Sequence, residues 1–306
     1  MKRIRWLAVI GGGYVGRGFA IQFAHGGYEV SLYNRTKESS ARAMDGINSY
    51  LTSFVKNRFF KKKDANNTLS LIKPTLSFED AASNADFVVE CIPEELSLKQ
   101  EIFARLDCFC PPHCVISSAT SHLKLKDIGK KTKRKDKLIV IHPYTPTPLR
   151  PVIEVVRGVG TSQETFLITK SLLESVGKEV VDVKEQIGVR VTTAIRRESM
   201  YMVERGIASP EEIDKVLYGI GILPVFSGMD ASGLDVFLSI HGYLQKELDN
   251  RKYPSPLLRE KVERGELGMK SGKGFFEWNE ASARQAVEKR IKVLILRLRE
   301  REALEG

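Results

Sequence analysis

Two residues, His142 and Glu154, carry side chains that could together transfer a proton. His142 follows the apolar run 138–141, and Glu154 lies within a second apolar run, 152–156. The prolines between these runs predict a turn that brings two strand ends together. A carboxylate set against an imidazole fixes the tautomer of the ring and raises its basicity, as removal of a hydroxyl proton requires. The pair is therefore a candidate for acid–base catalysis, with a structural histidine as the alternative.

A glycine-rich loop follows the first apolar run of the chain. Residues 11–16 read GGGYVG, a G-x-G-x-x-G match between a predicted strand at 7–10 and a predicted helix at 15–23. The first glycine permits a tight turn, the second lets a pyrophosphate approach the backbone, and the third allows close packing of helix on strand. The helix start adds N–H groups and the positive end of its dipole. The predicted dinucleotide contacts are Gly11, Gly13, Tyr14, Val15 and Gly16.

The residues after the second predicted strand, 29–33, bear on which dinucleotide is bound. An NAD site usually has Asp or Glu there, to bond the ribose 2′-hydroxyl. This chain has Asn34 and Arg35. A neutral Asn does not repel a 2′-phosphate, and Arg can pair with one. The sequence favours NADP; the alternative is NAD, with Asn34 on the ribose and Arg35 stacked on the adenine.

The elements that must position these residues alternate in the first half of the chain. Apolar runs predict strands at 7–10, 29–33, 87–89, 115–116, 138–141 and 152–156, and amphipathic stretches predict helices at 15–23, 38–60 and 95–106. This alternation predicts a parallel sheet covered on both faces. Later helical stretches, at 189–204, 210–218, 234–248 and 256–264, have no strands between them. The expected fold is an α/β Rossmann domain with a doubly wound parallel sheet over residues 1–186, followed by an all-α domain over 187–306.

Composition narrows the class of protein. The 306 residues are 42% hydrophobic, which excludes a disordered chain, and no apolar run is long enough to cross a bilayer. The net charge of +10 suggests an anionic small-molecule partner or simply a solvated basic surface. No nucleic-acid motif accompanies the basic runs at 56–63 and 130–137, so neither nucleic acid nor membrane is an expected partner. Four cysteines form no disulfide framework, so a cytoplasmic location is expected.

A possible metal cluster is formed by Cys108, Cys110, His113 and Cys114. Its spacing is not that of a zinc knuckle, and no second cluster completes four ligands. We therefore expect no metal site, and interpret these thiols as packed at the end of a helix.

Further motifs occur in a specific order and spacing. They are ECIPE at 90–94, LKQEIF at 98–103, SSATS at 117–121, HPY at 142–144, VVRG at 155–158 and GMKSGKGFF at 268–276. With the glycine loop, they make the chain resemble the L-3-hydroxyacyl-CoA dehydrogenases and their relatives that act on gulonate and carnitine. The resemblance implies an oxidoreductase that uses NAD or NADP to oxidise a 3-hydroxyl reversibly, and a homodimer built through the helical domain.

The resemblance also assigns roles to individual residues. It implies that His142 is the general base, that Glu154 is its partner, and that Ser121 bonds the substrate oxygen beside the nicotinamide. It places three further residues at the cofactor, namely Glu94, Lys99 and Lys270.

Three positions depart from the family pattern, which has Asn where this chain has Ala119, Thr145 and Val189. An amide donor of the kind missing at Val189 is typically worth about 10² to 10³ in rate. Either a neighbour such as Arg190, Thr192 or Thr193 replaces it, or the activity is weak, or the substrate differs. A non-catalytic, nucleotide-binding relative is a further alternative.

The substrate class is left open by these departures. L-3-hydroxyacyl-CoA is the first expected substrate. A small free hydroxy acid is the alternative, because the residues that contact CoA in the family are replaced here by Tyr50 and Asn57. Arg190 offers a planar fork suited to a carboxylate. Arg197 is seven residues further on and shares a helix face with Arg190, and Arg196 lies about 100° away from Arg197. Arg190 and Thr145 are the candidate substrate contacts. The alternative is that Arg190 is a structural arginine and that Arg196 and Arg197 are surface charge.

The end of the chain extends beyond the family pattern. An apolar face stepping by four, three and four residues predicts a further helix, through Val287, Ile291, Leu294 and Leu298. This face is expected either to pack on its own subunit or to contribute to the dimer.

Overall fold

The computed structural model describes residues 4–305, without the side chains of 231, 232, 297, 298 and 300–305. Residues up to Leu248 form one compact unit, and those from Asp249 onward form a second. Within the described part of the chain, no helix is long and apolar enough to cross a membrane.

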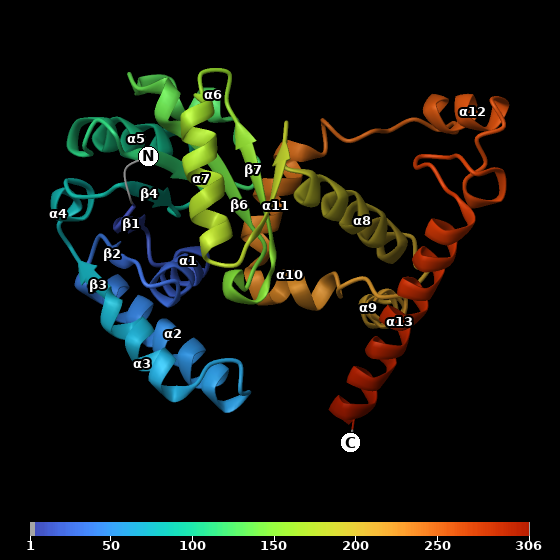
Figure 1. Cartoon of the computed structure of the whole chain (residues 1–306), viewed down its shortest axis with the longest axis horizontal. Helices are drawn as coiled ribbons and strands as arrows, with labels where there is room; N and C mark the ends of the chain where they lie inside the picture. Colours follow the sequence, from blue (N-terminus) through green and yellow to red (C-terminus); the bar gives the residue numbers. More distant parts are fainter. Residues whose placement is uncertain (1–3, 306) are drawn as a thin grey trace. The chain divides into compact units, whose positions relative to one another are not determined.

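The strands of the first unit form a single sheet, which has eight strands within the described residues and the order β3-β2-β1-β4-β5-β6-β7-β8 (Figure 1). Their bounds are β1 Trp6–Ile10, β2 Glu29–Tyr33, β3 Ile72–Thr75, β4 Phe87–Glu90, β5 Val115–Ser118, β6 Leu138–Pro143, β7 Val152–Arg157 and β8 Glu179–Val183. Neighbouring strands run parallel except β6 and β7, which are antiparallel. The expected all-parallel sheet is thus corrected to a mixed one. The reason is the short connection, residues 144–151, because a parallel crossover needs a dozen residues or more.

Helices cover both faces of the sheet, as a doubly wound fold requires. They are α1 Tyr14–His25, α2 Lys37–Lys56, α3 Lys62–Leu71, α4 Phe78–Ala82, α5 Leu96–Phe109, α6 Leu125–Ile128 and α7 Gln163–Ser175, with short 3₁₀ helices η1 Gly129–Lys131, η2 Lys135–Lys137 and η3 Thr147–Leu149. Two hydrophobic cores result, one including Phe19 of α1 and the other Phe103 of α5. Leu7 and Val9 of β1 enter the first core, and Ala8 and Ile10 the second. This alternation is the two-residue period of a strand buried on both faces.

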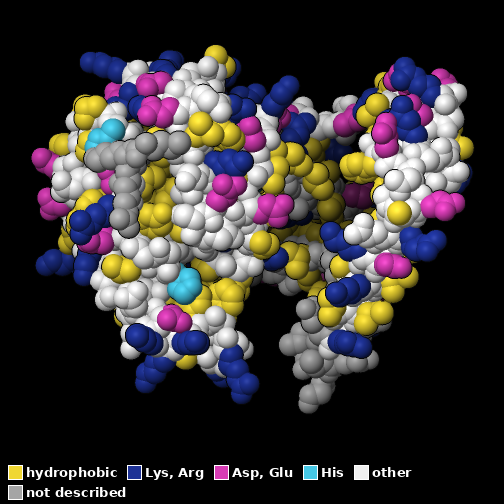
Figure 2. Space-filling model, in the orientation of Figure 1, with side chains coloured by type: hydrophobic (Ala, Val, Ile, Leu, Met, Phe, Trp, Pro, Cys, Tyr) yellow, Lys and Arg dark blue, Asp and Glu magenta, His cyan; other side chains and the backbone are white. Residues whose placement is uncertain are grey.

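The helix predicted at 38–60 is present as α2, but it ends four residues earlier than predicted, at Lys56, and a separate helix, α3, begins at Lys62. The side-chain amide of Asn57 donates to the carbonyl of Ser53 at 2.8 Å, and Arg58 follows with φ of +58°. Phe60 then packs back on Phe54, with ring centroids 5.2 Å apart. Exposed Lys and Arg side chains gather where α2 meets α3 (Figure 2). Of the strands and α-helices named so far, β3, β8, α3, α4, α6 and α7 were not predicted.

Only helices follow β8 in the described chain, as predicted. In the first unit they are α8 Ile187–Glu204, α9 Pro210–Gly219, α10 Phe226–Ser232 and α11 Leu234–Leu244. Val189 of α8 packs with Ile240 and Leu244 of α11 in a small core. The carboxylate of Asp214 in α9 accepts hydrogen bonds from the backbone N–H groups of residues 225–227, at 2.6 to 2.9 Å. These contacts hold the start of α10 against α9.

The second unit contains α12 Pro256–Glu263, the short 3₁₀ helix η4 Met269–Ser271 and α13 Glu280–Glu305. Lys261 of α12 donates to Glu266 and to the carbonyl of Gly274, at 2.7 and 2.8 Å, which closes the glycine-rich turn around η4. On α13, the predicted apolar residues Val287, Ile291 and Leu294 are exposed. The side chain of Leu298 lies outside the described residues.

Candidate active site

A cavity of about 1160 Å³ opens at the carboxyl ends of the strands and extends to the helices that follow them. The sheet contributes the glycine loop at 11–15, the end of β2 at 33–36, the segment after β4 at 91–93, and the ends of β5 and β6. The wall opposite comes from Val189, Thr192 and Arg196 of α8 and Val236, Phe237 and Ile240 of α11. Ligands bind at this edge of doubly wound sheets.

His142 lines this cavity, and Glu154 contacts its imidazole. They pair directly across antiparallel strands β6 and β7, which points their side chains to the same face of the sheet. His142 Nδ1 lies 2.8 Å from Glu154 Oε2, and both side chains are buried. Because a carboxylate only accepts, the ring carries its proton on Nδ1 and leaves Nε2 free to act as a base.

Glu154 is held ionised by its surroundings. Its second oxygen, Oε1, accepts the backbone N–H groups of Ile187 and Gly188, at 2.8 and 3.0 Å. Burial opposes the charge, but the hydrogen bonds from His142 and Gly188 outweigh it and lower the pKa of Glu154. These same contacts fix the start of α8 beside the imidazole.

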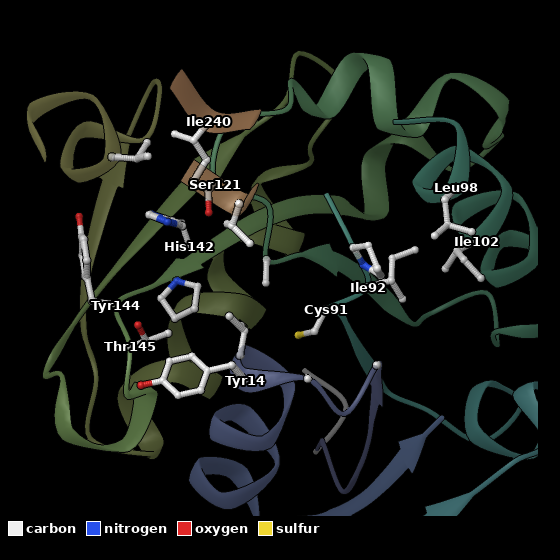
Figure 3. A pocket seen from close by; sticks show the side chains of 18 of the residues that line it. Tyr14, Cys91, Ile92, Leu98, Ile102, Ser121, His142, Tyr144, Thr145 and Ile240 are labelled. Atoms are coloured by element: carbon white, nitrogen blue, oxygen red, sulfur yellow. The ribbon is translucent and has the colours of Figure 1, made fainter. Parts of the chain in front are cut away.

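Ser121 faces the same cavity as His142 (Figure 3). Its backbone N–H donates to Glu94 Oε1 at 2.8 Å, and the hydroxyl of Thr120 donates to the same oxygen at 2.5 Å. Glu94 thus holds the loop that presents the Ser121 hydroxyl.

Lys99 is buried and forms an ion pair with Glu94. Its ammonium lies 2.6 Å from Glu90 Oε1 and 3.1 Å from Glu94 Oε2, and its side chain is only 1% exposed. Burial alone would lower the pKa of Lys99, but the two carboxylates raise it. Glu90, fully buried, also accepts the Ser118 hydroxyl at 2.6 Å. The ammonium group of Lys99 therefore contacts two carboxylates of the protein. The predicted contacts of Lys99 and Glu94 with the cofactor stay predictions.

The glycine loop has the geometry that a dinucleotide needs. Gly11 adopts φ of +106°, and a Cβ on Gly16 would lie 1.8 Å from the carbonyl oxygen of Gly11. A Cβ on Gly13 would meet no atom within 4 Å, so its open side faces the cavity. Tyr14, at the start of α1, also lines the cavity (Figure 3). Val15, the next residue, lines it as well.

The side chain of Asn34 has a hydrogen-bond donor that no described residue satisfies, which also indicates a ligand site. Its Oδ1 accepts the backbone N–H of Gly12 at 3.0 Å, whereas its buried Nδ2 has no partner within the described residues. A buried donor without an acceptor is costly, and a ribose hydroxyl would satisfy it. Arg35 and Arg42 line the same end of the cavity with exposed side chains. The residues present therefore fit a dinucleotide.

The remaining predicted contacts lie in different places. Thr145 lines the cavity. The guanidinium of Arg190 instead contacts Glu185 at 3.0 Å and the carbonyl of Glu247 at 2.7 Å. Lys270 lies in η4 of the second unit, where it is exposed.

Several cavity residues were not predicted as site residues, among them Arg42 and Cys91. Thr192 was expected only as one possible replacement for the missing Asn, and Arg196 only as a neighbour of Arg190 and Arg197. Val189, Thr192 and Arg196 are spaced by three and four residues, which places them on one helix face. That periodicity was a usable signal. No sequence pattern indicated that Arg42, in the second turn of α2, would line the cavity.

Within the described residues, no group of three or more His, Cys, Asp or Glu side chains is placed to hold a metal ion. In the segment singled out above, Cys110 and Cys114 are buried, and His113 Nε2 lies 2.9 Å from Asp86.

Comparison with known proteins adds the family. Residues 6–186 match the family described as "3-hydroxyacyl-CoA dehydrogenase, NAD binding domain", and residues 187–278 match "3-hydroxyacyl-CoA dehydrogenase, C-terminal domain". The chain is similar to the probable 3-hydroxybutyryl-CoA dehydrogenase of Bacillus subtilis, with 34% identity over 92% of this chain and 99% of that protein. It is also similar to the 5-formyl-3-hydroxy-2-methylpyridine 4-carboxylate 5-dehydrogenase of Mesorhizobium japonicum, with 29% identity over 97% of this chain and 99% of that protein.

A solved structure shows the same architecture. M. tuberculosis FadB2 superposes with a TM-score of 0.76 and 28% identity, covering 91% of this chain and all of that one. The resemblance noted from the sequence motifs is thus confirmed over both matched regions. The chain belongs to the 3-hydroxyacyl-CoA dehydrogenase family of NAD-binding oxidoreductases.

Proposed function

We propose that this chain catalyses the reversible oxidation of the 3-hydroxyl of an L-3-hydroxyacyl-CoA. Residues 1–186 bind the nucleotide, and residues 187–306 bind the substrate and a second copy of the chain. The observation that carries the proposal is the buried His142–Glu154 pair, 2.8 Å apart, whose His142 lines the same cavity as the glycine loop. Lys270, Glu94 and Lys99 stay proposed cofactor contacts.

The chain's own residues account for the proton transfer. A nicotinamide, when bound, supplies the hydride acceptor or donor. His142 Nε2 takes the proton of the substrate hydroxyl, and Glu154 stabilises the imidazolium that forms. Ser121 donates a hydrogen bond to the substrate oxygen. In the reverse direction the imidazolium returns the proton to the carbonyl oxygen.

NADP is the proposed dinucleotide. Arg35 and Arg42 line the end of the cavity where Asn34 presents its free amide, and Thr36 and Ser39 line the same end. Two guanidinium groups near the ribose position suit a 2′-phosphate, which accepts charge-assisted hydrogen bonds.

A small free hydroxy acid is the second candidate substrate. The relative from M. japonicum acts, by its name, on a pyridine carboxylate. Its 29% identity extends over nearly the whole of both chains, so a carboxylate substrate is compatible with this fold.

We also propose a homodimer formed through residues 187–306. Its support is the exposure of large apolar side chains in that part, including Ile207 at 65%, Val216 at 62% and Leu238 at 77%. Light scattering coupled to size exclusion should give twice the mass of the chain. The mass of one chain at micromolar concentration would contradict the proposal.

The cytoplasm is the proposed compartment. All four cysteines are free thiols, and Cys110 and Cys114 are buried. Free thiols persist where glutathione keeps proteins reduced. Fractionation of cells with an antibody to this chain would test the location.

The reaction is tested with purified protein and L-3-hydroxybutyryl-CoA, with NAD⁺ or NADP⁺, by the absorbance of the reduced cofactor. Acetoacetyl-CoA with NADH or NADPH tests the reverse direction. We expect turnover with the L isomer, no turnover with the D isomer, and a higher kcat/KM with the phosphorylated cofactor. Absence of turnover in both directions with both cofactors would refute the proposal.

A further inference from the structure

Arg196 is a cation in the helical wall of the cavity. It lies on α8 in one row with Val189 and Thr192, and all three side chains line the cavity. Phe237 and Ile240 of α11 complete this wall. Burial lowers the pKa of Arg196, because the apolar surroundings disfavour its charge. A partly buried charge of this kind usually has a partner that offsets its desolvation.

The contacts of Arg196 with the protein are neutral. One terminal nitrogen donates to the Thr192 hydroxyl at 3.1 Å, and the guanidinium lies over the ring of Phe237, 4.5 Å from its centroid. No carboxylate among the described residues forms an ion pair with it. Burial and the nearby Arg196 lower the pKa of His241, which favours its neutral form, so it does not offset the charge of Arg196. Since a guanidinium has five N–H donors, most of its bonding capacity remains for a ligand.

Arg190, on the same helix, provides a contrast. Its guanidinium contacts the carboxylates of Glu185 and Glu247, at 3.0 and 3.5 Å. Its charge is therefore offset within the protein. Of these two arginines, the one that lines the cavity is the one without a carboxylate among the described residues.

The charge of Arg196 lies close to the proposed chemistry. Helix α8 begins at the N–H groups that bond Glu154, the partner of His142. Helical side chains point back toward the helix start, and Arg196 reaches back to Thr192, one turn before it. At 1.5 Å per residue, Thr192 is about 6 Å along the axis from Gly188. Because His142, Thr192 and Arg196 line the same cavity, an anionic group bound at Arg196 would share that cavity with the proposed base.

We propose that Arg196 binds a carboxylate on the reacting half of the substrate. A planar guanidinium pairs with a carboxylate through two parallel hydrogen bonds. That carboxylate is either the free acid group of a short 3-hydroxy or 3-oxo acid, or the far end of a dicarboxylic acyl chain attached to CoA. The inference rests on the proposed function of this site, and it adds the chemical class that the site selects.

The test compares acetoacetate, 3-oxoadipyl-CoA and acetoacetyl-CoA, of which only the last lacks a carboxylate. Each is reduced with NADPH by the wild type and by Arg196→Met, Arg196→Lys and Arg205→Met. Arg205→Met is the matched control, because Arg205 is an exposed residue at the end of the same helix. Thermal melting establishes that each variant is folded.

We expect Arg196→Met to raise KM about ten- to hundredfold for the carboxylate that the site accepts, as loss of a charged hydrogen-bonding partner does. For acetoacetyl-CoA, KM should change by no more than about twofold, as should all KM values of Arg205→Met. Arg196→Lys should recover part of the loss. A selective effect on acetoacetate assigns a free acid, and one on 3-oxoadipyl-CoA assigns a dicarboxylic thioester.

Unchanged KM values in Arg196→Met, or an equal change for acetoacetyl-CoA, would overturn the inference while leaving the proposed function intact. If the wild type reduces none of the three compounds with either NADPH or NADH, and also fails to oxidise L-3-hydroxybutyryl-CoA, the proposed function has failed. Calorimetric binding of acetoacetate and 3-oxoadipyl-CoA then decides the inference by itself. Binding that Arg196→Met abolishes supports it, and absent or unaltered binding contradicts it.

Discussion

His142 and Glu154 are direct neighbours across the antiparallel pair β6 and β7, and their side chains meet at 2.8 Å. The register places both on one face of the sheet, so no loop is needed to bring the carboxylate to the imidazole. Glu154 also accepts the first N–H groups of α8. One carboxylate thus orients the proposed base and fixes the helix that forms the opposite wall of the cavity.

Substitutions at two glycines of the loop should have different effects, one mainly on stability and the other mainly on nucleotide binding. Gly16→Ala places a Cβ 1.8 Å from the carbonyl oxygen of Gly11, so we expect a loss of about 1–3 kcal/mol in the free energy of unfolding. Gly13→Ala meets no protein atom within 4 Å and should unfold almost like the wild type. It should nevertheless weaken NADPH binding, because its methyl group occupies the approach of the pyrophosphate. Urea unfolding and fluorescence titration measure the two effects, and a Gly13→Ala variant with unaltered binding would contradict the placement of the cofactor.

Arg35 and Arg42 should determine the choice of dinucleotide. Arg35→Ala and Arg42→Ala should each weaken NADPH by about 1.5–3 kcal/mol, the worth of a hydrogen bond to a charged group, and should barely affect NADH. Lys37→Ala removes a neighbouring positive charge and serves as the control, because Lys37 is exposed at the start of α2. Dissociation constants from nucleotide fluorescence give the result. Equal losses for both nucleotides would remove the 2′-phosphate assignment.

The contribution of Glu154 to stability should depend on pH. Its pKa in the folded chain is lower than in the unfolded chain, so its stabilisation is fully present above the unfolded value, about 4.3, and is lost as the pH falls through the folded value. Glu154→Gln should therefore be less stable than the wild type at pH 7, by about 1–3 kcal/mol. This difference should shrink as the pH falls below about 5. Urea unfolding of both proteins across this range provides the measurement, and a difference independent of pH would show that the ionised carboxylate is not what stabilises the fold.

Much of this fold could be predicted from short-range sequence patterns. The glycine loop, the strand before it and the helix after it could be predicted because each depends on residues adjacent in sequence. The turn between His142 and Glu154 was predicted from its prolines. Its consequence, an antiparallel pair in an otherwise mostly parallel sheet, follows from the length of the connection and was overlooked. The break after Lys56 depends on Phe60 packing back on Phe54, a tertiary contact without a strong local signal.

Arg190 and Arg196 of α8 show what could not be predicted from the sequence. Arg190 was a candidate substrate contact, but its partner Glu247 is 57 residues away, and nothing in the sequence pairs them. Arg196 shares a helix face with Val189, which the spacing does indicate. Whether that face lines a cavity or packs on a neighbour depends on the position of α11, which only the folded structure supplies.

The turnover of His142→Asn tests the central claim most directly. General-base catalysis is worth about 10²-fold or more, so kcat for L-3-hydroxybutyryl-CoA should fall at least that far. The dissociation constant for NADPH should stay at its wild-type value, because the glycine loop, Asn34 and Arg35 are untouched. A kcat close to that of the wild type would contradict the assignment of His142 as the base, and with it the account of this site.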